Sequence, residues 1–305
     1  MNKRFSIMIV GGNGFIGQNL ARYFIEKGHE VSVFDMKKPE CEVPGVVYYE
    51  GDFFDDTSID LITEKQDIVI HALSTINPGN SNVAYMRGYT NDFVQTVRLF
   101  DRLVLTKGKL LFLSSAGTIY GKYAGRPFEE SDPLCPINHY GGVKLCVETA
   151  MRAFNEQQGT KLISCRITNP YGPGQDYSKG VGFIDAVIQS ILRDQHLEIW
   201  GDGSVVRDFI YIEDVCRMIN GLLYYEGDMR SFNISTGVGT SQIEIIRLFE
   251  KLGFHINVDC LPRRAVDVMC SIAKNDKIVS VTGIVPRLLE QGIKDYLIHL
   301  RMLKT

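Results

Sequence analysis

The chain has 305 residues, 45% of them hydrophobic and 23% charged, and its formal net charge is −3. This composition is typical of a globular protein with one large domain or two interleaved lobes, and the slight acidic balance argues against a nucleic-acid or acidic-membrane partner. The seven cysteines include no C-x-x-C pair, so we expect a reducing, cytoplasmic environment and neither disulfides nor a metal site. No apolar run approaches the ~20 residues of a membrane span.

A strand, a glycine loop and a helix are predicted at the start of the chain. Residues 5–10 are an apolar run, and the pattern Gly-x-x-Gly-x-x-Gly follows it directly. Here the first glycine permits a tight turn, the second lets the backbone approach a pyrophosphate, and the third lets the helix pack closely on the sheet. Free backbone N–H groups at the helix start would bind the anion. The expected contacts are Gly11, Gly14, Phe15, Ile16 and Gly17.

An acidic residue closes the second predicted strand. Asp35 follows the apolar residues 31–34, about 20 residues beyond the loop, where a carboxylate binds the ribose hydroxyls of a dinucleotide. Because a carboxylate there repels a 2′-phosphate, we expect NAD rather than NADP. Lys37 and Lys38 would either be solvated turn residues or weaken this preference.

Two more strands are predicted at residues 46–49 and 67–72. Asp52 and Phe53 follow the first of them, and we assign both to the cofactor site. Asp52 would either cap the next turn or accept a hydrogen bond from the adenine amino group. His71, in the second strand, is interpreted as a packed structural residue.

Candidate catalytic hydroxyls follow a helix and a fifth strand. Helical spacing of apolar residues predicts one long helix over about 83–105, and residues 109–113 form the next strand. This strand leads to Ser115 and Thr118 at its carboxyl end, the edge of an open parallel sheet where ligands bind.

A tyrosine and a lysine open the next predicted helix, over residues 139–157. Tyr140 and Lys144 are four residues apart and so lie on one face of that helix. The lysine ammonium and an adjacent nicotinamide cation would lower the tyrosine pKa, and such a phenol can act as a base near neutral pH. The spacing also occurs by chance on many helices, but its place after the fifth strand of a nucleotide-binding sheet favours catalysis.

The remainder of the chain predicts a second lobe. A rigid turn at 169–174 follows a sixth strand, and short strands and helices continue from there, with Ser241 as an expected helix N-cap. The fold class is α/β, a Rossmann-type doubly wound parallel sheet with a smaller α/β substrate-binding lobe. We assign residues 1–168 to the NAD-binding domain, with 203–226 returning to it, and residues 169–305 to the interleaved lobe.

Together the motifs resemble the extended short-chain dehydrogenase/reductase family, in its NAD-dependent epimerase/dehydratase branch, and most closely its UDP-glucose 4-epimerase-like members. The resemblance covers nearly the whole chain. It rests on the glycine loop, Gly51-Asp52, Ser114-Ser115, Tyr120-Gly121, Tyr140-x-x-x-Lys144, Asn169-Pro170-Tyr171-Gly172-Pro173, Gly201-Asp202-Gly203, Arg207-Asp208, and Arg264 with Asp267.

The resemblance implies roles for these residues. Tyr140 would be the catalytic base and acid, Lys144 would hold the nicotinamide ribose, and Ser115 would bond the reacting sugar oxygen, with Thr118 as the alternative hydroxyl. The forked guanidinium group of arginine suits phosphate oxygens, so Arg207 would bind a substrate phosphate. Alternatively, Arg207 pairs with Asp208. The residues implied to bind substrate are Ser115, Thr118, Asn169, Arg207, Arg264, Asp267 and Ser271.

Ala116 and the Asn91–Asp92 pair depart from the family pattern, and Ser271 is expected to affect the choice of sugar. Ala116 stands where the family often has its catalytic hydroxyl, so that role moves to Ser115. Asn91 and Asp92 compete for the position of the usual asparagine in the long helix. Ser271 lies where a residue can gate the sugar pocket, and a small side chain there would admit an N-acetylhexosamine, unless it merely turns the chain.

The implied activity is 4-epimerisation of a nucleotide sugar, probed first with UDP-linked hexoses, by transient oxidation at C4 and hydride return to the other face. A nucleotide-4-ketosugar reductase is the alternative enzyme, and a non-catalytic NAD-sensing binding protein is the alternative of another class. A 4,6-dehydratase would carry an Asp-Glu pair just after the catalytic hydroxyl, where this chain has Ala116-Gly117-Thr118. Family members often pair the two long helices into a homodimer, and polysaccharide biosynthesis is the expected pathway.

Overall fold

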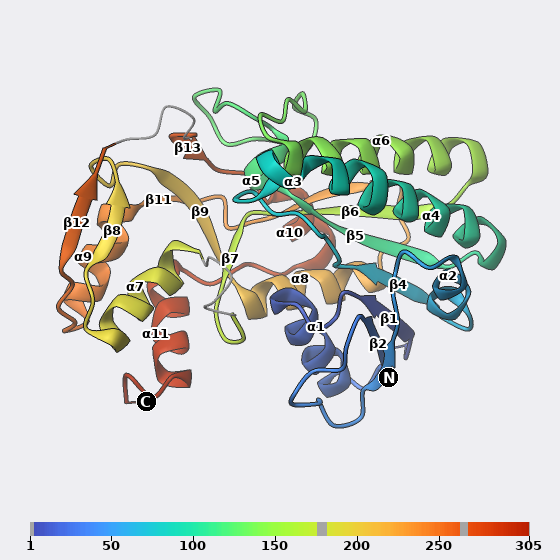
Figure 1. Cartoon of the computed structure of the whole chain (residues 1–305), viewed down its shortest axis with the longest axis horizontal. Coiled ribbons are helices and arrows are strands. Elements are labelled where there is room, and N and C mark those ends of the chain that lie inside the picture. Colours follow the sequence, from blue (N-terminus) through green and yellow to red (C-terminus); the bar gives the residue numbers. More distant parts are fainter. Residues whose placement is uncertain (1–2, 176–181, 263–267, 305) are drawn as a thin grey trace.

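A seven-stranded parallel sheet, with strand order β10-β6-β5-β4-β1-β2-β3, forms the larger lobe of the computed structural model, which describes residues 3–175, 182–262 and 268–304. Figure 1 shows this lobe beside a smaller one. The strands are β1 (Ser6–Val10), β2 (Glu30–Asp35), β3 (Val47–Glu50), β4 (Ile68–His71), β5 (Lys109–Ser115), β6 (Lys161–Ile167) and β10 (Ser231–Ile234). The predicted Rossmann-type sheet is confirmed.

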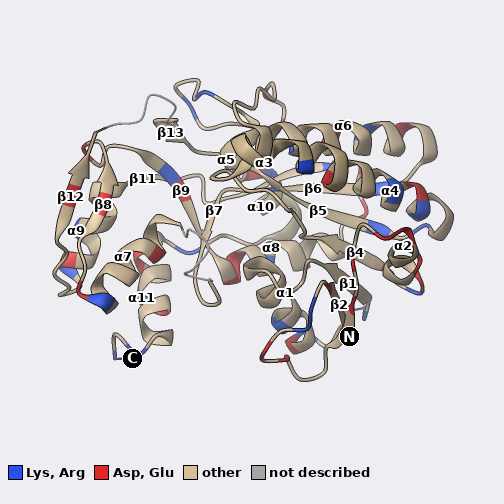
Figure 2. Ribbon diagram, in the orientation of Figure 1, with Lys and Arg blue, Asp and Glu red and all other residues tan. Residues whose placement is uncertain are grey.

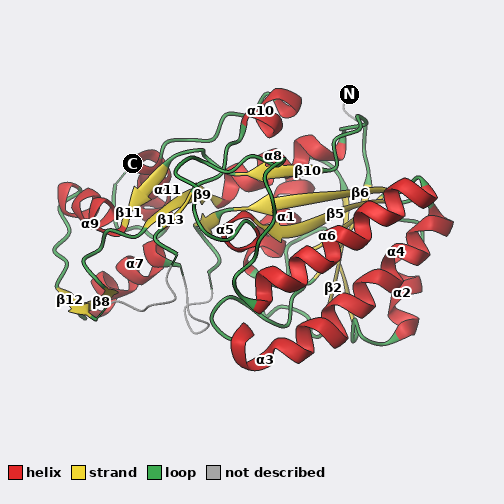
Figure 3. Ribbon diagram, turned by 90° about the horizontal axis from the view of Figure 1, so that it is seen from above, coloured by secondary structure: helices red, strands yellow, loops and turns green. Residues whose placement is uncertain are grey.

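Helices cover both faces of this sheet. In β1, Ile7 and Ile9 belong to one hydrophobic core and Met8 and Val10 to the other, as the two-residue period of a strand requires. Helices α1 (Phe15–Glu26), α8 (Ile212–Leu223) and α10 (Asp276–Thr282) pack on the first core, and α2 (Asp56–Thr63), α4 (Val94–Thr106) and α6 (His139–Gln158) on the second. Figure 3 shows α2, α4 and α6 side by side.

The long helix predicted over 83–105 is confirmed, since the chain is helical without a break over 81–106, but it is not a uniform α-helix. It is divided into α3 (Ser81–Arg87), a π-helical turn η1 (Gly88–Phe93) and α4. The hydroxyl of Thr96 donates to the carbonyl of Asp92 at 2.6 Å, and the Asp92 side chain is bonded to the loop after β4. Such turns often mark functional sites.

The smaller lobe is built around strand β9. Strand β9 (Val206–Tyr211) pairs with β7 (Asn169–Tyr171), β11 (Gly239–Ser241) and β13 (Cys270–Ser271), and β8 (Leu197–Trp200) pairs with β12 (Val258–Leu261). Helices α7 (Phe183–Arg193), α9 (Gln242–Lys251) and α11 (Leu289–His299) pack on it. The predicted Ser241 N-cap is confirmed by a capping box with Glu244. The segment predicted as a rigid turn, 169–174, begins instead as strand β7.

The chain crosses between the lobes more than once. Helix α8 contacts α1, and β10 extends the larger sheet. The predicted domain boundaries remain a proposal. That proposal left β10 and α10 in the smaller lobe, whereas both pack with the larger sheet. Figure 2 shows basic and acidic residues interspersed. Among them, Arg102 of α4 forms an ion pair with Asp60 of α2. No helix among the described residues has the length and apolarity that crossing a membrane requires.

Candidate active site

The glycine loop between β1 and α1 has the geometry that phosphate binding requires. Gly11 has a φ of +74°, and a Cβ on Gly17 would lie 2.6 Å from Gly12 Cα, so the helix packs directly on the loop. A Cβ on Gly14 would meet only Gly11 O, at 3.4 Å. Gly14 is also the N-cap of α1 and provides no side-chain cap. The first N–H groups of this 12-residue helix are therefore not capped by a side chain of Gly14, which is the arrangement that binds phosphate at the start of a helix.

A pocket of about 250 Å³ lies beside this loop and is lined by Asp35, Asp52 and Phe53 together with Leu73, Ser74 and Thr75. The Asp35 carboxylate accepts hydrogen bonds from the backbone N–H groups of Asn13 at 2.9 Å and Met36 at 2.8 Å. It is thus held at the edge of the pocket, where it can bind ribose hydroxyls.

The side chains of the other two predicted cofactor residues, Asp52 and Phe53, already have partners within the protein. Asp52 accepts from Phe54 N at 3.0 Å, so it makes the turn-capping bond that was one of its alternatives. The Phe53 ring is buried against the rings of His71 and Phe54. Its side chain therefore belongs mainly to the core of the larger lobe.

The candidate catalytic groups lie where β5 meets the start of α6. Lys144 is buried, and its Nζ donates to the carbonyl of Leu113 at 3.0 Å and lies 5.5 Å from the centre of the Tyr140 ring. Ser115 ends β5 and begins the short helix α5 (Ala116–Ile119). A Cβ on Gly141 would lie 2.6 Å from the Thr118 carbonyl, so α6 packs tightly on this turn. The structure thus brings together the predicted residues of both segments.

Thr118 carries a polar atom that points to a ligand. Its Oγ1 is buried and has no hydrogen-bond partner among the described residues. Buried hydroxyl groups are normally satisfied, so an unpartnered one beside Ser115 fits a site that bonds a substrate oxygen.

Burial has the largest effect on the pKa values of Tyr140 and Lys144. Burial raises the Tyr140 pKa to about 12, and the nearby Asp92 carboxylate also raises it. Burial lowers the Lys144 pKa to about 8, against the effect of Asp92 and Glu148, which raise it. Among the protein's own groups, burial and Asp92 therefore hold the Tyr140 pKa above its usual value, and the expected lowering by Lys144 and a nicotinamide cation stays a prediction.

Asp92 is the residue that sequence reasoning left undecided. It is 4% exposed, whereas Asn91 is half-buried. Its carboxylate accepts from the backbone N of Thr75 at 2.8 Å, the hydroxyl of Thr75 at 2.7 Å and the hydroxyl of Ser74 at 3.2 Å. The only signal in the sequence for a buried carboxylate here was the pair of hydroxyl residues, Ser74 and Thr75, in the loop that follows β4.

A second pocket, of about 200 Å³, contains two predicted substrate residues, Asn169 and Arg207. Asn169 donates to the carbonyl of Asp208 at 2.9 Å, which fixes β7 to β9. The Asp208 carboxylate is fully buried and accepts from Thr236 and Gly237, so it is satisfied without Arg207.

The three remaining predicted substrate residues are Arg264, Asp267 and Ser271. Arg264 and Asp267 fall outside the described residues. Ser271 pairs in register with Arg207 and is 4% exposed. It therefore lies within the small sheet, next to the strand that carries Arg207.

Comparison with known proteins agrees with this geometry. The model of the NAD dependent epimerase/dehydratase family matches residues 7–235. A UDP-glucose 4-epimerase of Halalkalibacterium halodurans is 30% identical over 303 residues, covering 92% of this chain and 91% of its own. A dTDP-4-dehydro-6-deoxyglucose reductase of Escherichia coli is 30% identical over 266 residues, covering 84% and 83%. The structure of the Thermotoga maritima UDP-glucose 4-epimerase with UDP-glucose aligns with a TM-score of 0.91 at 29% identity, covering 97% and 99%.

Proposed function

The chain belongs to the NAD-dependent epimerase/dehydratase family, and we propose that it is a nucleotide-sugar 4-epimerase that uses NAD and acts on UDP-linked hexoses. One observation carries the proposal. The Tyr140–Lys144 pair and the unpartnered Thr118 hydroxyl lie at the sheet edge that also presents the dinucleotide loop, and a separate pocket holds Asn169 and Arg207. Cofactor and nucleotide sugar would thus meet at the tyrosine.

Each residue has a defined task in this reaction. Tyr140 takes the proton of the C4 hydroxyl and later returns it, while Ser115 and Thr118 bond the C4 oxygen. Lys144 holds the nicotinamide ribose. When bound, NAD supplies the hydride acceptor and donor, and its nicotinamide cation supplies the field that lowers the Tyr140 pKa.

The nucleotide must stay bound while the 4-ketosugar rotates in the pocket. Asn169, Arg207 and Arg264 would bind the diphosphate, and Asp267 would contact the substrate elsewhere. Binding energy placed on the nucleotide, away from the reacting carbon, allows rotation of the sugar. A small Ser271 would leave room for an N-acetylhexosamine; a Ser271→Tyr variant that still epimerises N-acetylated substrates at the original rate would contradict this.

We also propose that two copies associate through their two long helices, the one over 81–106 and α6, in the cytoplasm, and that the products serve polysaccharide biosynthesis. The dimer is supported by large apolar side chains that are exposed on the first of these helices. They are Val83, Met86, Val94 and Leu105. Sedimentation of the protein, and of a Val83→Glu, Leu105→Glu variant, tests the association.

The test of function uses purified protein in native mass spectrometry, followed by incubation with UDP-glucose and UDP-N-acetylglucosamine. Co-purified NAD and conversion to the C4 epimer without added cofactor support the epimerase. Tyr140→Phe should retain NAD and lose turnover by about 10²–10⁴-fold. A protein that exchanges NADPH freely and reduces a 4-ketosugar would instead match the activity of the reductase relative, and retained NAD with no turnover on any nucleotide sugar would favour a sensor.

A further inference from the structure

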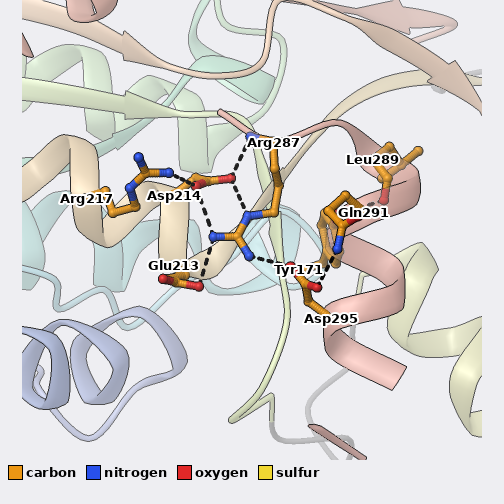
Figure 4. Close-up of polar contacts among 8 residues, drawn as sticks. All are labelled: Tyr171, Glu213, Asp214, Arg217, Arg287, Leu289, Gln291 and Asp295. Carbon is orange, nitrogen blue, oxygen red and sulfur yellow. Dashed lines mark hydrogen bonds and ion pairs between the residues drawn. The ribbon is translucent and has the colours of Figure 1, made fainter. Parts of the chain in front are cut away.

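Arg287 lies between the hydrophobic cores of the two lobes, at the centre of a cluster of acidic residues (Figure 4). Helix α8 contributes Val215 and Ile219 to the core beneath the large sheet, and it contacts α1. Helix α11 contributes Ile293 and Leu297 to the core of the smaller lobe. A side chain that binds both helices therefore links one lobe to the other.

Arg287 donates hydrogen bonds to acidic residues of both helices. Its Nε donates to Asp214 Oδ2 at 3.0 Å and its backbone N donates to the same oxygen at 2.9 Å. Its Nη2 donates to Glu213 at 2.9 Å, and its Nη1 donates to Asp295 of α11 at 2.6 Å. Asp214 is completely buried and the Arg287 side chain is 18% exposed, so these charges are largely removed from water. Buried pairs of this kind hold their geometry tightly but are costly to break.

The same guanidinium also fixes the ends of two strands. It lies 4.6 Å from the centre of the Tyr211 ring, at the end of β9, and the Tyr211 ring lies 5.5 Å from that of Tyr171, at the end of β7. The Tyr171 hydroxyl donates to the carbonyl of Leu289, at the start of α11, at 3.4 Å. These are the strands that carry Asn169 and Arg207 into the second pocket.

We propose that Arg287 is a positioning residue that holds the nucleotide-binding strands β7 and β9 in a fixed place relative to the catalytic edge of the large sheet. It acts through the strands on which Asn169 and Arg207 lie. This role rests on the proposed epimerase function. It assigns to a residue far from Tyr140 the task of keeping the sugar within reach of it.

An epimerase is sensitive to this placement because its intermediate must not escape. The bound cofactor would supply the hydride acceptor while Tyr140 takes the hydroxyl proton, so the oxidised sugar has to stay in the site until both are returned. Dissociation of the 4-ketosugar would leave the cofactor reduced and unable to start another cycle with a hexose. A looser smaller lobe would release the intermediate more often, since small misplacements can cost up to about 100-fold in rate.

Three variants distinguish a positioning role of Arg287 from a role in folding alone. Arg287→Gln removes all of the guanidinium bonds. Asp295→Asn breaks the ionic link to α11 alone and leaves the buried Asp214 paired, so it keeps the proposal testable if Arg287→Gln does not fold. Arg217→Gln is the matched control, because Arg217 donates to the same Asp214 at 2.9 Å but from within α8.

We expect KM for the UDP-hexose to rise about 10-fold in Arg287→Gln and several-fold in Asp295→Asn, and NADH absorbance to accumulate several-fold faster per turnover. Arg217→Gln should match the wild type in both readouts. Folded Arg287→Gln and Asp295→Asn proteins with wild-type KM and wild-type NADH accumulation would overturn the proposal.

Binding of UDP to the holoenzyme, measured by calorimetry, separates this proposal from the proposed function. Weakened UDP binding in Arg287→Gln and Asp295→Asn, but not in Arg217→Gln, supports the positioning role even if no hexose is epimerised. Equal UDP binding in all four proteins, in the absence of epimerase activity, would overturn it.

Discussion

Asp92 accepts two hydrogen bonds from Thr75, one from its backbone N–H at 2.8 Å and one from its hydroxyl at 2.7 Å. Thr75 lines the pocket beside the glycine loop, and the π-helical turn that carries Asp92 contacts α6, the helix of Tyr140 and Lys144. A single buried carboxylate therefore connects the cofactor pocket with the catalytic helix. Its charge raises the pKa of both Tyr140 and Lys144.

Replacing Asp92 by Asn should move the pH profile of epimerisation to lower pH. The amide can keep hydrogen bonds to Thr75 but removes the negative charge, so Tyr140 ionises more easily and Lys144 loses its proton at a pH below about 8. We expect both limbs of the profile to shift down by about one pH unit. The measurement is kcat/KM against pH, with Asn91→Ala as the control in the same turn. An unshifted profile in Asp92→Asn would show that the carboxylate has no electrostatic role.

The contrast between Asp92 and the Tyr140–Lys144 pair explains what the sequence could predict. Tyr140 and Lys144 share a helix, so their spacing alone places them on one face. The position of Asp92 depends on Ser74 and Thr75, which belong to a different segment, and on a π-helical turn that helical periodicity does not reveal. The amphipathic pattern correctly gave the helix but could not say where it is interrupted.

The same limit applies to the smaller lobe. Strand β7 was predicted as a turn because it is short and contains Pro170, yet it pairs with β9, which lies about 40 residues further along. Arg287 gave no signal at all, since its partner Asp214 is 73 residues away. By contrast, β1, β4 and β5 are largely apolar runs that are buried along almost their whole length, as their own composition predicts.

Two alanine variants of the glycine loop should fail in different ways. Gly17→Ala places a Cβ 2.6 Å from Gly12 Cα, so we expect lower stability as well as loss of NAD. Gly14→Ala meets only Gly11 O at 3.4 Å, and Gly14 has an ordinary φ of −69°. It should fold with a loss of less than about 1 kcal/mol, as for an N-cap change, but bind NAD poorly because the methyl group occupies the phosphate space. Thermal melts and cofactor retention distinguish them; normal NAD content in Gly14→Ala would contradict the assignment.

The buried pair Glu148–Arg166 should be important for stability. Both side chains are 4% exposed, and Arg166 Nη2 donates to Glu148 Oε2 at 2.6 Å. Arg166→Met leaves a buried carboxylate unpaired and should cost about 3–5 kcal/mol in urea unfolding, much of which the additional change Glu148→Leu should recover. The control is Arg4→Gln, which breaks a pair with Glu30 whose side chains are 65% and 64% exposed and should cost at most about 1 kcal/mol. Equal losses in Arg166→Met and Arg4→Gln would contradict the argument.

A buried carboxyl in the smaller lobe should make stability fall as the pH rises. Asp185 of α7 is fully buried; its Oδ1 accepts from the Tyr296 hydroxyl at 2.8 Å, and its Oδ2 has no partner among the described residues. Burial raises the Asp185 pKa from 3.8 to about 7, so the folded state holds a proton that the unfolded state has lost between these values. Unfolding then releases a proton, and this group alone lowers stability with increasing pH, by up to about 1.4 kcal/mol per pH unit.

Asp185→Asn removes that titration while keeping a polar partner for Tyr296. The variant should gain stability relative to the wild type progressively from pH about 4 to about 7, the window set by the two pKa values, and the difference should then level off. Below that window both carboxyl states are protonated and the two proteins should differ by a constant amount. Urea midpoints across the range give the result. A difference that does not change with pH would mean that Asp185 is ionised in the folded protein and that its charge is compensated.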